Sequence, residues 1–380
     1  MEEQKTTWFQ ERGFSKNPFS LEPISKDEIK TKAFVDRTEA KEDIKNFVQE
    51  GSGAIIVLSE IGYGKSSMMN FASELSKEGG KTVLMLDIRT TIDKREKESK
   101  ICFFKALAQE VFIKVFEKQN KIDVAPALFL KNFYANGNEN QLHRLLQILK
   151  EIFEQNPSVL IMDDLDKLLN FKKHIFFIKE VIDLLPKNIQ VISTGDVNQI
   201  MNSRVIVSML YSIFDFPIVL GEIDSTEKLK EFVYGKMEAY AINTQKIQFE
   251  EDIFKILLDR THGNLRETFR YLSELLKLGK FSVDDLINVI IKIDAGRLFS
   301  LDEIDKRTLL FLSGNKKTLK EIQIFLSSER IKLSLQMIRF RLDELHQNCW
   351  TYKGKTRDSK KIIYSAPEVL KHMIKLENIS

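Results

Sequence analysis

The chain has 380 residues, of which 43% are hydrophobic and 30% are charged, and its formal net charge at pH 7 is +3. This composition excludes an intrinsically disordered chain, and the length predicts two or three domains. The two cysteines, Cys102 and Cys349, are far apart in sequence, which excludes a disulfide framework and a CxxC metal site. The first residues have no apolar signal core, and no later run reaches the roughly 20 apolar residues that span a bilayer. We therefore expect a cytoplasmic protein.

An α/β core is predicted from residue 34 to 222, after an N-terminal arm (1–33) that we expect to pack on the domain behind it. In this core, short apolar runs alternate with helical or turn-forming sequence, which is typical of a parallel sheet covered by helices on both faces. The long crossover between residues 92 and 157 predicts two helices joined by a polar loop, Ile101–Phe116 and Gln141–Phe153. The predicted strands are Ala54–Leu58, Thr82–Asp87, Ser158–Asp163, Gln190–Thr194 and Phe216–Leu220.

A phosphate-binding loop, or P-loop, is predicted after the first strand, where Ser59 to Ser66 read SEIGYGKS. Its glycines allow backbone N–H groups to converge on phosphate oxygens. The Lys65 ammonium can reach the β- and γ-phosphates of ATP, and the Ser66 hydroxyl can bind Mg²⁺. Ser59 replaces the first glycine of the P-loop pattern, which predicts either some strain or only an added hydroxyl. The predicted nucleotide contacts are Ser59, Gly62, Tyr63, Gly64, Lys65, Ser66 and Ser67.

Two aspartates follow the apolar residues of the third predicted strand. Asp163 is predicted to hold Mg²⁺ through water, and Asp164 to orient or deprotonate the attacking water. Glutamate is commoner at the second position, and aspartate is one methylene shorter. The pair therefore predicts ATP hydrolysis, at a slow rate.

Five motifs occur in an order that resembles AAA+ ATPases, over about residues 34 to 295. The ordered set is far more specific than any one of its members. The resemblance implies a P-loop core with a parallel sheet, followed by an all-α lid. The motifs are the P-loop, Asp163-Asp164, Ser193-Thr194-Gly195-Asp196, Asn202-Ser203-Arg204 and Gly263-Asn264-Leu265-Arg266.

The resemblance also implies roles for residues outside the P-loop. Thr194 corresponds to sensor 1, which contacts the γ-phosphate or the water, and Asp196 is the alternate. Arg266 corresponds to sensor 2, which couples the angle of the lid to the nucleotide state. Arg204 resembles the arginine finger offered to a neighbouring subunit, which implies self-assembly, although a solvated arginine is the alternative. Val35 lies in the segment that lines the adenine pocket.

Two further domains are predicted after the core. Residues 223–297 contain only amphipathic helical patterns, at Thr226–Tyr240, Glu250–Thr261, Leu265–Leu278 and Ser282–Lys292, and form the predicted lid. Residues 298–380 read as a winged helix, because two capped helices precede two β-like runs around a basic loop. The last 80 residues carry 16 Lys and Arg against 10 Asp and Glu, which favours a polyanionic partner.

Double-stranded DNA is the predicted partner of the winged helix, with a protein partner as the alternative. In such domains the second helix enters the major groove while the wing contacts phosphates or the minor groove. The second helix is predicted at Leu335–His346. The candidate groove residues are Gln336, Arg339 and Arg341, and the candidate wing residues are Lys353, Lys355, Arg357, Lys360 and Lys361.

An AAA+ core, a lid and a winged helix in one chain resemble the archaeal origin-recognition and cell-division-cycle replication initiators. This resemblance implies an ATP/ADP- and Mg²⁺-dependent DNA-binding switch, associated with the nucleoid, with AAA+ partner subunits and a replicative helicase as further partners. Two alternatives stay open. A branch-migration motor would hydrolyse ATP steadily, and a signalling or transposition-regulating ATPase would bind a protein through its winged helix.

Overall fold

The described residues of the computed structural model fall into two compact units. One unit contains the described residues from 37 to 221, and the other contains those from 222 to 370 together with residues 7–22. Within the described ranges, no helix is both long enough and apolar enough to cross a membrane. The described residues are 7–22, 37–50, 52–87, 99–118, 122, 124–165, 172–197, 200, 204–242, 247–347, 350–355, 362–367 and 370.

A five-stranded parallel sheet in the order β2-β3-β4-β1-β5 forms the centre of the first unit. Its inner strands are almost completely buried, as expected for a parallel sheet with helices on both faces. All five predicted strands are confirmed, which confirms the α/β class of the core. The strands are β1 (Gly53–Ser59), β2 (Thr82–Asp87), β3 (Ser158–Asp163), β4 (Ile189–Asp196) and β5 (Phe216–Val219).

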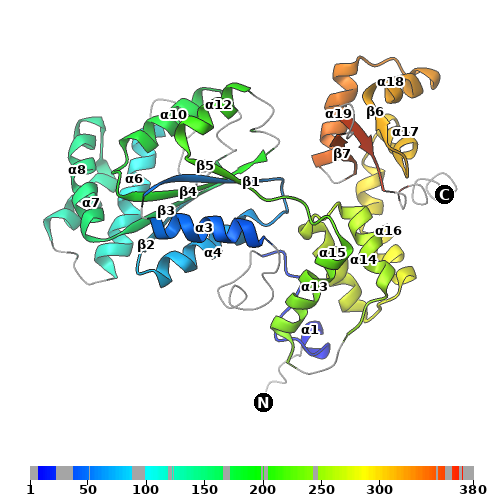
Figure 1. The fold of residues 1–380 in the computed structure, drawn as a ribbon, viewed down its shortest axis with the longest axis horizontal. Helices are drawn as coiled ribbons and strands as arrows, with labels where there is room; N and C mark the ends of the chain where they lie inside the picture. The colour runs from blue at the N-terminus through cyan, green and yellow to red at the C-terminus, as the bar shows by residue number, and fades with distance from the viewer. Residues whose placement is uncertain are drawn as a thin grey trace. The chain divides into compact units, whose positions relative to one another are not determined.

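Helices cover both faces of this sheet. Figure 1 shows α3 and α4 on one face and α10 and α12 on the other. The crossover between β2 and β3 adds a packed group of helices whose side chains extend the same hydrophobic core. The helices of this unit are α3 (Thr38–Glu50), α4 (Lys65–Glu78), α6 (Ser99–Val111), the π-helix η1 (Phe112–Glu117), α7 (Ala125–Asn136), α8 (Glu139–Gln155), α10 (Lys172–Leu184) and α12 (Arg204–Ile213).

The crossover differs from the prediction of two helices, because α7 is an additional one. This helix buries Ala127, Leu130 and Phe133 on one side, yet it also exposes Leu128 and Tyr134. Apolar residues therefore occur around most of its circumference, and the periodic contrast that identifies an amphipathic helix is weak. Only residues 137 and 138 separate it from α8, so the polar loop is shorter than expected.

The register of the sheet brings together the predicted site residues. Ser59 lies opposite Asp196, and Val57 lies opposite Thr194. On the other side of β4, the pairing of β3 runs to Met162, directly before Asp163. Because all strands are parallel, the P-loop and the polar ends of β3 and β4 share one edge of the sheet.

The second unit contains four helices in the range predicted for the lid. The sequence boundaries hold closely for the first three, and the fourth continues further than predicted. Amphipathic patterns explain them, since each helix buries one apolar stripe. They are α13 (Thr226–Tyr240), α14 (Glu251–Thr261), α15 (Leu265–Leu278) and α16 (Val283–Phe299).

Residues 7–22 of the predicted arm pack on these lid helices, in the same unit. The short helix α1 (Trp8–Glu11) precedes Phe14 and Phe19, which are both buried. The Phe19 ring lies 5.7 Å from that of Phe269 between centroids, and Asn17 Nδ2 donates to Ser273 Oγ at 3.0 Å. Residues 7–22 therefore belong to the same compact unit as the lid helices, more than 200 positions later in the sequence.

A winged helix completes the second unit. Three helices pack beside a small antiparallel sheet in the order β6-β8-β7. The predicted capping box is present, because Thr318 N donates to Glu321 Oε2 at 2.8 Å and Glu321 N donates to Thr318 Oγ1 at 3.4 Å. The elements are α17 (Glu303–Leu312), β6 (Lys317–Thr318), α18 (Leu319–Ser328), α19 (Leu335–Gln347), β7 (Tyr352–Lys355) and β8 (Ile362–Ser365).

Candidate functional site

The P-loop has the backbone conformation that its glycines predict. Gly62 and Gly64 adopt φ angles of 92° and 93°, in a region that side chains with a Cβ rarely enter. Gly64 is also the N-cap of α4, a helix of 14 residues whose first N–H groups have no partner within the helix. Ser59 is fully buried, has no positive φ angle, and its Oγ donates to Glu60 O at 2.9 Å. Serine therefore occupies this position without the backbone strain that a positive φ angle would cause.

Lys65 and Ser66 occupy the first turn of α4. Lys65 Nζ lies over the loop and donates to the carbonyl oxygens of Ser59 at 2.6 Å and Glu60 at 3.2 Å. Ser66 Oγ lies 3.5 Å from Asp163 Oδ2, although 97 positions separate the two residues. Tyr63 is buried, and its carbonyl oxygen accepts from Arg37 at 3.5 Å. Ser67 follows in the same helical turn.

Asp163 is held by its neighbours on β3 and β4. Its Oδ1 accepts from Thr194 Oγ1 at 2.5 Å and from Asp164 N at 3.0 Å. The Asp164 N–H also lies 2.9 Å from Thr194 Oγ1, and Asp164 itself has a φ angle of 59°. Aspartate tolerates this left-handed conformation better than most residues. In this arrangement the Thr194 hydroxyl positions the Asp163 carboxylate, and Asp164 turns the chain away from the strand.

Asp196 is the buried last residue of β4, opposite Ser59 in the register. It shares the edge of the sheet with the P-loop, as the alternate sensor 1 assignment requires. The structure therefore brings Thr194 and Asp196 to the same edge of the sheet, where the Thr194 hydroxyl donates to Asp163.

These residues fit a nucleotide phosphate with Mg²⁺. A hydroxyl and a carboxylate 3.5 Å apart offer the oxygen ligands that Mg²⁺ prefers, and Ser66 and Asp163 would hold the ion. The N-terminus of α4 and the ammonium of Lys65 supply positive potential for phosphate oxygens. When bound, Mg²⁺ would neutralise charge on the phosphates. Among the described residues, no group of three or more His, Cys, Asp or Glu forms a separate metal site.

Two kinds of solved structure share the fold of this chain. The Walker-type ATPase PABY2304 of Pyrococcus abyssi aligns with 94% of this chain and 99% of its own at 17% identity, with a TM-score of 0.60. The ORC2 protein of Aeropyrum pernix aligns with 97% of this chain and all of its own at 13% identity, with TM-scores of 0.54 for the ADPNP-ADP form and 0.51 for the ADP form. This chain has an AAA+ ATPase fold. Neither a family model nor a curated protein matches its sequence.

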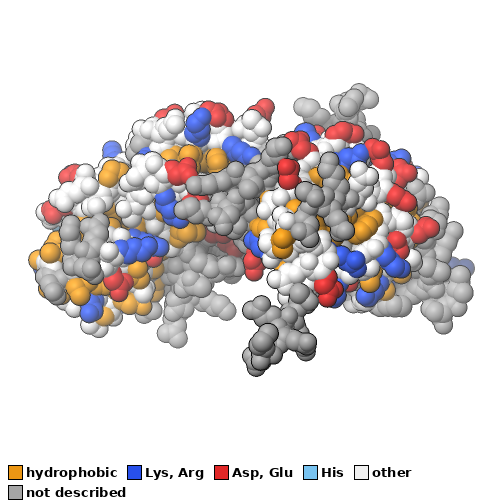
Figure 2. Space-filling view, turned by 90° about the horizontal axis from the view of Figure 1, so that it is seen from below, with side chains coloured by type: hydrophobic (Ala, Val, Ile, Leu, Met, Phe, Trp, Pro, Cys, Tyr) orange, Lys and Arg blue, Asp and Glu red, His pale blue; other side chains and the backbone are white. Residues whose placement is uncertain are grey.

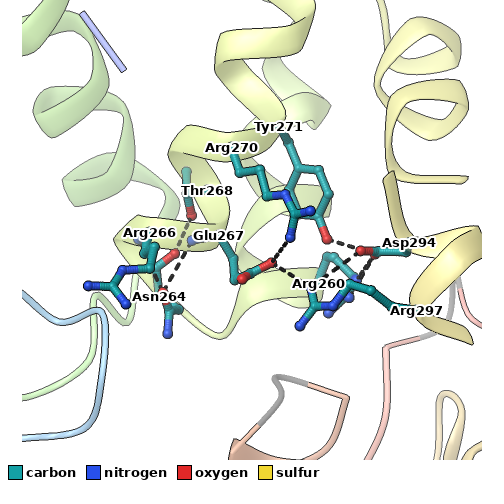
Figure 3. A network of polar contacts seen from close by, with 9 residues as sticks. All are labelled: Arg260, Asn264, Arg266, Glu267, Thr268, Arg270, Tyr271, Asp294 and Arg297. Carbon is teal, nitrogen blue, oxygen red and sulfur yellow. Dashed lines mark hydrogen bonds and ion pairs between the residues drawn. The ribbon is translucent and has the colours of Figure 1, made fainter. Parts of the chain in front are cut away.

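The lid helices contain a buried ion pair (Figure 3). Arg260 of α14 and Asp294 of α16 both have fully buried side chains, and the guanidinium donates from Nε at 3.0 Å and Nη2 at 2.7 Å to Asp294 Oδ2. The Tyr271 hydroxyl donates to the same oxygen at 2.7 Å. Burial raises the pKa of Tyr271 above its ordinary range, so the phenol stays protonated and remains a donor.

This network extends from the lid to the winged helix through Trp350. The Arg260 and Arg297 guanidinium carbons lie 4.9 and 5.4 Å from the centroid of the buried indole ring. Arg297 also donates to Glu267 Oε2 at 3.0 Å. Two cations of the lid thus contact one aromatic ring of the winged helix, and we call this set (Arg260, Asp294, Arg297 and Trp350) the arginine–tryptophan clamp.

Arg266 lies at the start of α15, directly before Glu267 of this network (Figure 3). Asn264 caps the helix, since its Oδ1 accepts from the backbone N–H groups of Arg266 at 3.1 Å and Glu267 at 3.2 Å. Gly263 has a φ angle of 72°, and a Cβ there would lie 2.3 Å from Ile223 O. The glycine and asparagine of the motif therefore shape the turn that presents Arg266. Its sensor 2 role stays a prediction.

The winged helix places its predicted DNA contacts in two kinds of environment. Arg341 faces α17, where it forms ion pairs with Asp302 and, at 2.8 Å, with Asp305. Lys353 Nζ donates to Asp343 Oδ1 at 2.8 Å, within the domain. By contrast, Gln336 and Arg339 are exposed on α19. Only these last two of the four present their side chains to solvent, and Arg341 instead holds α19 against α17.

Figure 2 shows one face of the molecule, on which basic, acidic and hydrophobic side chains are interspersed. Several predicted contacts lie outside the described residues or have side chains outside them: Val35, Arg204, Lys355, Arg357, Lys360 and Lys361.

The arginine–tryptophan clamp is not predicted from the sequence. Arg260 follows the buried Ile253 and Leu257 at helical spacing, and Asp294 follows the buried Leu286 and Ile290 in the same way. A charged residue that continues an apolar stripe is the signal that would have marked both as buried partners. The pairing itself, across 34 positions, has no sequence signature.

Proposed function

We propose that this protein is an ATP-dependent DNA-binding switch that resembles a replication initiator. The observation that carries the proposal is the combination of a complete P-loop edge in one unit with a winged helix attached to the lid by the clamp in the other. The ADPNP and ADP in the Aeropyrum pernix ORC2 structures support adenine nucleotide as the ligand.

In the proposed reaction, Lys65 and the N–H groups of the P-loop bind the β- and γ-phosphates. Ser66 and Asp163 hold Mg²⁺, and Thr194 keeps the Asp163 carboxylate in place through the 2.5 Å hydrogen bond. Asp164 would orient the attacking water. Its left-handed backbone conformation sets the direction of its short side chain. The shorter carboxylate supports slow turnover, which suits a switch better than a motor.

The proposed output is a change in DNA binding. Glu267 follows Arg266 directly and binds Arg297, which in turn contacts Trp350 of the winged helix. A movement of the start of α15 would therefore be passed to the winged helix through packed, partly buried groups rather than through a flexible linker. Origin recognition or helicase loading is the proposed role, with AAA+ partner subunits and a replicative helicase as proposed partners.

The test measures binding of a fluorescent duplex by anisotropy with no nucleotide, with ADP and with a slowly hydrolysed ATP analogue. We expect affinity to differ at least several-fold between nucleotide states in the natural protein and to be independent of nucleotide in Lys65→Ala. Equal affinity in all states, with nucleotide shown to be bound, would refute the switch.

The two alternatives predict different results in the same experiments. A branch-migration motor would hydrolyse ATP steadily and faster with branched DNA than with linear duplex. A signalling or transposition-regulating ATPase would shift no duplex even at low salt, where phosphate contacts are strongest. Slow, duplex-sensitive ATPase with nucleotide-dependent affinity distinguishes the switch from both.

A further inference from the structure

The exposed face of α19 carries two large apolar side chains that the core does not use. Phe340 is 59% exposed and Met337 is 49% exposed. At 3.6 residues per turn, Phe340 lies one turn after Gln336 on the same line of the helix, and Met337 lies beside that line. The opposite side buries Ile338 and Leu342, so the packing of the helix is complete without Phe340.

Basic side chains lie next to this line. Arg330 and Lys332 are exposed in the turn that precedes α19, and Arg339 is exposed on the helix itself. Arg339 forms an ion pair with Asp343 at 3.9 Å, and Lys353 binds the same carboxylate at 2.8 Å. These exposed positive charges surround a narrow line of apolar side chains. Such a surface complements the phosphates of a duplex, whereas the centre of a protein–protein interface is usually depleted of charge.

The major groove offers partners for both kinds of side chain. The thymine C5-methyl is the apolar group on the base edges, and phenylalanine is among the residues that contact it. Glutamine pairs with the N6 and N7 atoms of adenine. Residues one turn apart on a helix are separated by about 6 Å along its axis, which is close to the roughly 7 Å rise of two base-pair steps. Gln336 and Phe340 can therefore meet bases that lie two steps apart.

We propose that α19 reads A·T base pairs in the major groove, with Gln336 donating to and accepting from adenine and with Phe340 and Met337 covering thymine methyl groups. This inference rests on the proposed function, because it requires that the winged helix bind duplex DNA. It makes Phe340 a specificity-determining residue, whereas Arg330, Lys332 and Arg339 supply affinity for any duplex.

The experiment compares two duplexes of about 30 base pairs, one of alternating dA and dT and one in which every dT is replaced by dU. The replacement removes only the methyl group from the groove. The full-length protein should bind the thymine duplex at least roughly fourfold more tightly, which corresponds to ~0.8 kcal/mol for one buried methyl group. Phe340→Ala should lose most of this thymine preference, with Met337 keeping the remainder, while the salt dependence of its affinity stays unchanged.

Leu310→Ala is the matched control, since Leu310 is an exposed leucine of α17 in the same domain. This variant should keep the full thymine preference, and circular dichroism checks that both variants are folded. Equal binding of the two duplexes by the natural protein, or an undiminished preference in Phe340→Ala, overturns the inference and leaves DNA binding intact. Failure of the natural protein to bind either duplex at low salt overturns the inference together with the proposed DNA partner.

Discussion

Removal of one carboxylate from the arginine–tryptophan clamp should strongly destabilise the second unit. In Asp294→Ala, the guanidinium of Arg260 stays at a fully buried position without its counter-charge, and the Tyr271 hydroxyl loses its acceptor. Breaking a buried ion pair by removing one partner costs about 3–5 kcal/mol, and an unsatisfied buried hydroxyl adds roughly 1 kcal/mol. We therefore expect a loss of about 4–6 kcal/mol in the free energy of unfolding of this unit.

Trp350 provides the signal for this measurement. The protein has two tryptophans, so in a Trp8→Phe background the fluorescence comes from the ring that contacts Arg260 and Arg297. For a urea dependence of ~2 kcal/mol/M, the expected loss moves the unfolding midpoint by about 2–3 M. Asp284→Ala, which removes an exposed aspartate from the first turn of the same helix, should cost less than about 1 kcal/mol.

A triple variant separates the charge effect from simple loss of packing. Arg260→Met, Asp294→Leu and Tyr271→Phe together replace the buried polar groups by apolar ones of similar size. Such replacements are often neutral or stabilising, so the triple variant should recover most of the stability lost in Asp294→Ala. The reasoning is refuted if Asp294→Ala costs under about 1 kcal/mol, or if the triple variant is as unstable as the single one.

Three further predictions concern the nucleotide site and the backbone and pH response of the second unit. Lys65→Ala should abolish binding of a fluorescent ATP analogue, whereas Asp163→Asn should keep binding in the absence of Mg²⁺ and lose phosphate release; normal release by Asp163→Asn would contradict the assignment. Gly263→Ala should lower stability by at least ~2 kcal/mol, because its Cβ would lie 2.3 Å from Ile223 O and its φ angle is 72°; an unchanged urea midpoint would show that this turn adapts. Burial raises the pKa of Tyr364 to about 12, so the stability that its neutral phenol contributes is fully present below about pH 10 and is lost as the pH rises from about 10 to about 12. Tyr364→Phe should lack this component in a pH series of urea midpoints.

The short motifs are the part of this protein that the sequence predicts best. Gly62 and Gly64 adopt the positive φ angles that a P-loop requires, and Asp163 lies at the end of a buried strand, as expected. These features depend on neighbours within a few residues, so local chemistry is enough to predict them. The capping box at Thr318 follows the same logic.

Contacts between distant segments could not be predicted in this way. The sequence suggests that Arg341 faces DNA, yet it forms ion pairs with Asp302, the N-cap of α17, and with Asp305 of that helix. It predicts that Thr194 contacts a phosphate or a water molecule, which stays a prediction, but it does not predict that the Thr194 hydroxyl donates to Asp163 on the neighbouring strand. In both cases the residue type was informative, but its partner depends on strand order and helix packing.

The sequence by itself determined the α/β class of the core, because apolar strands, the glycine loop after the first strand and helical patterns each depend on neighbours within a few residues. Tertiary structure decided how the parts are joined. It placed residues 7–22 on the lid helices and brought Arg260, Asp294 and Trp350 into one buried cluster. The physical reason is that a buried charge requires a partner of opposite charge, and which residues are buried depends on the path of the whole chain.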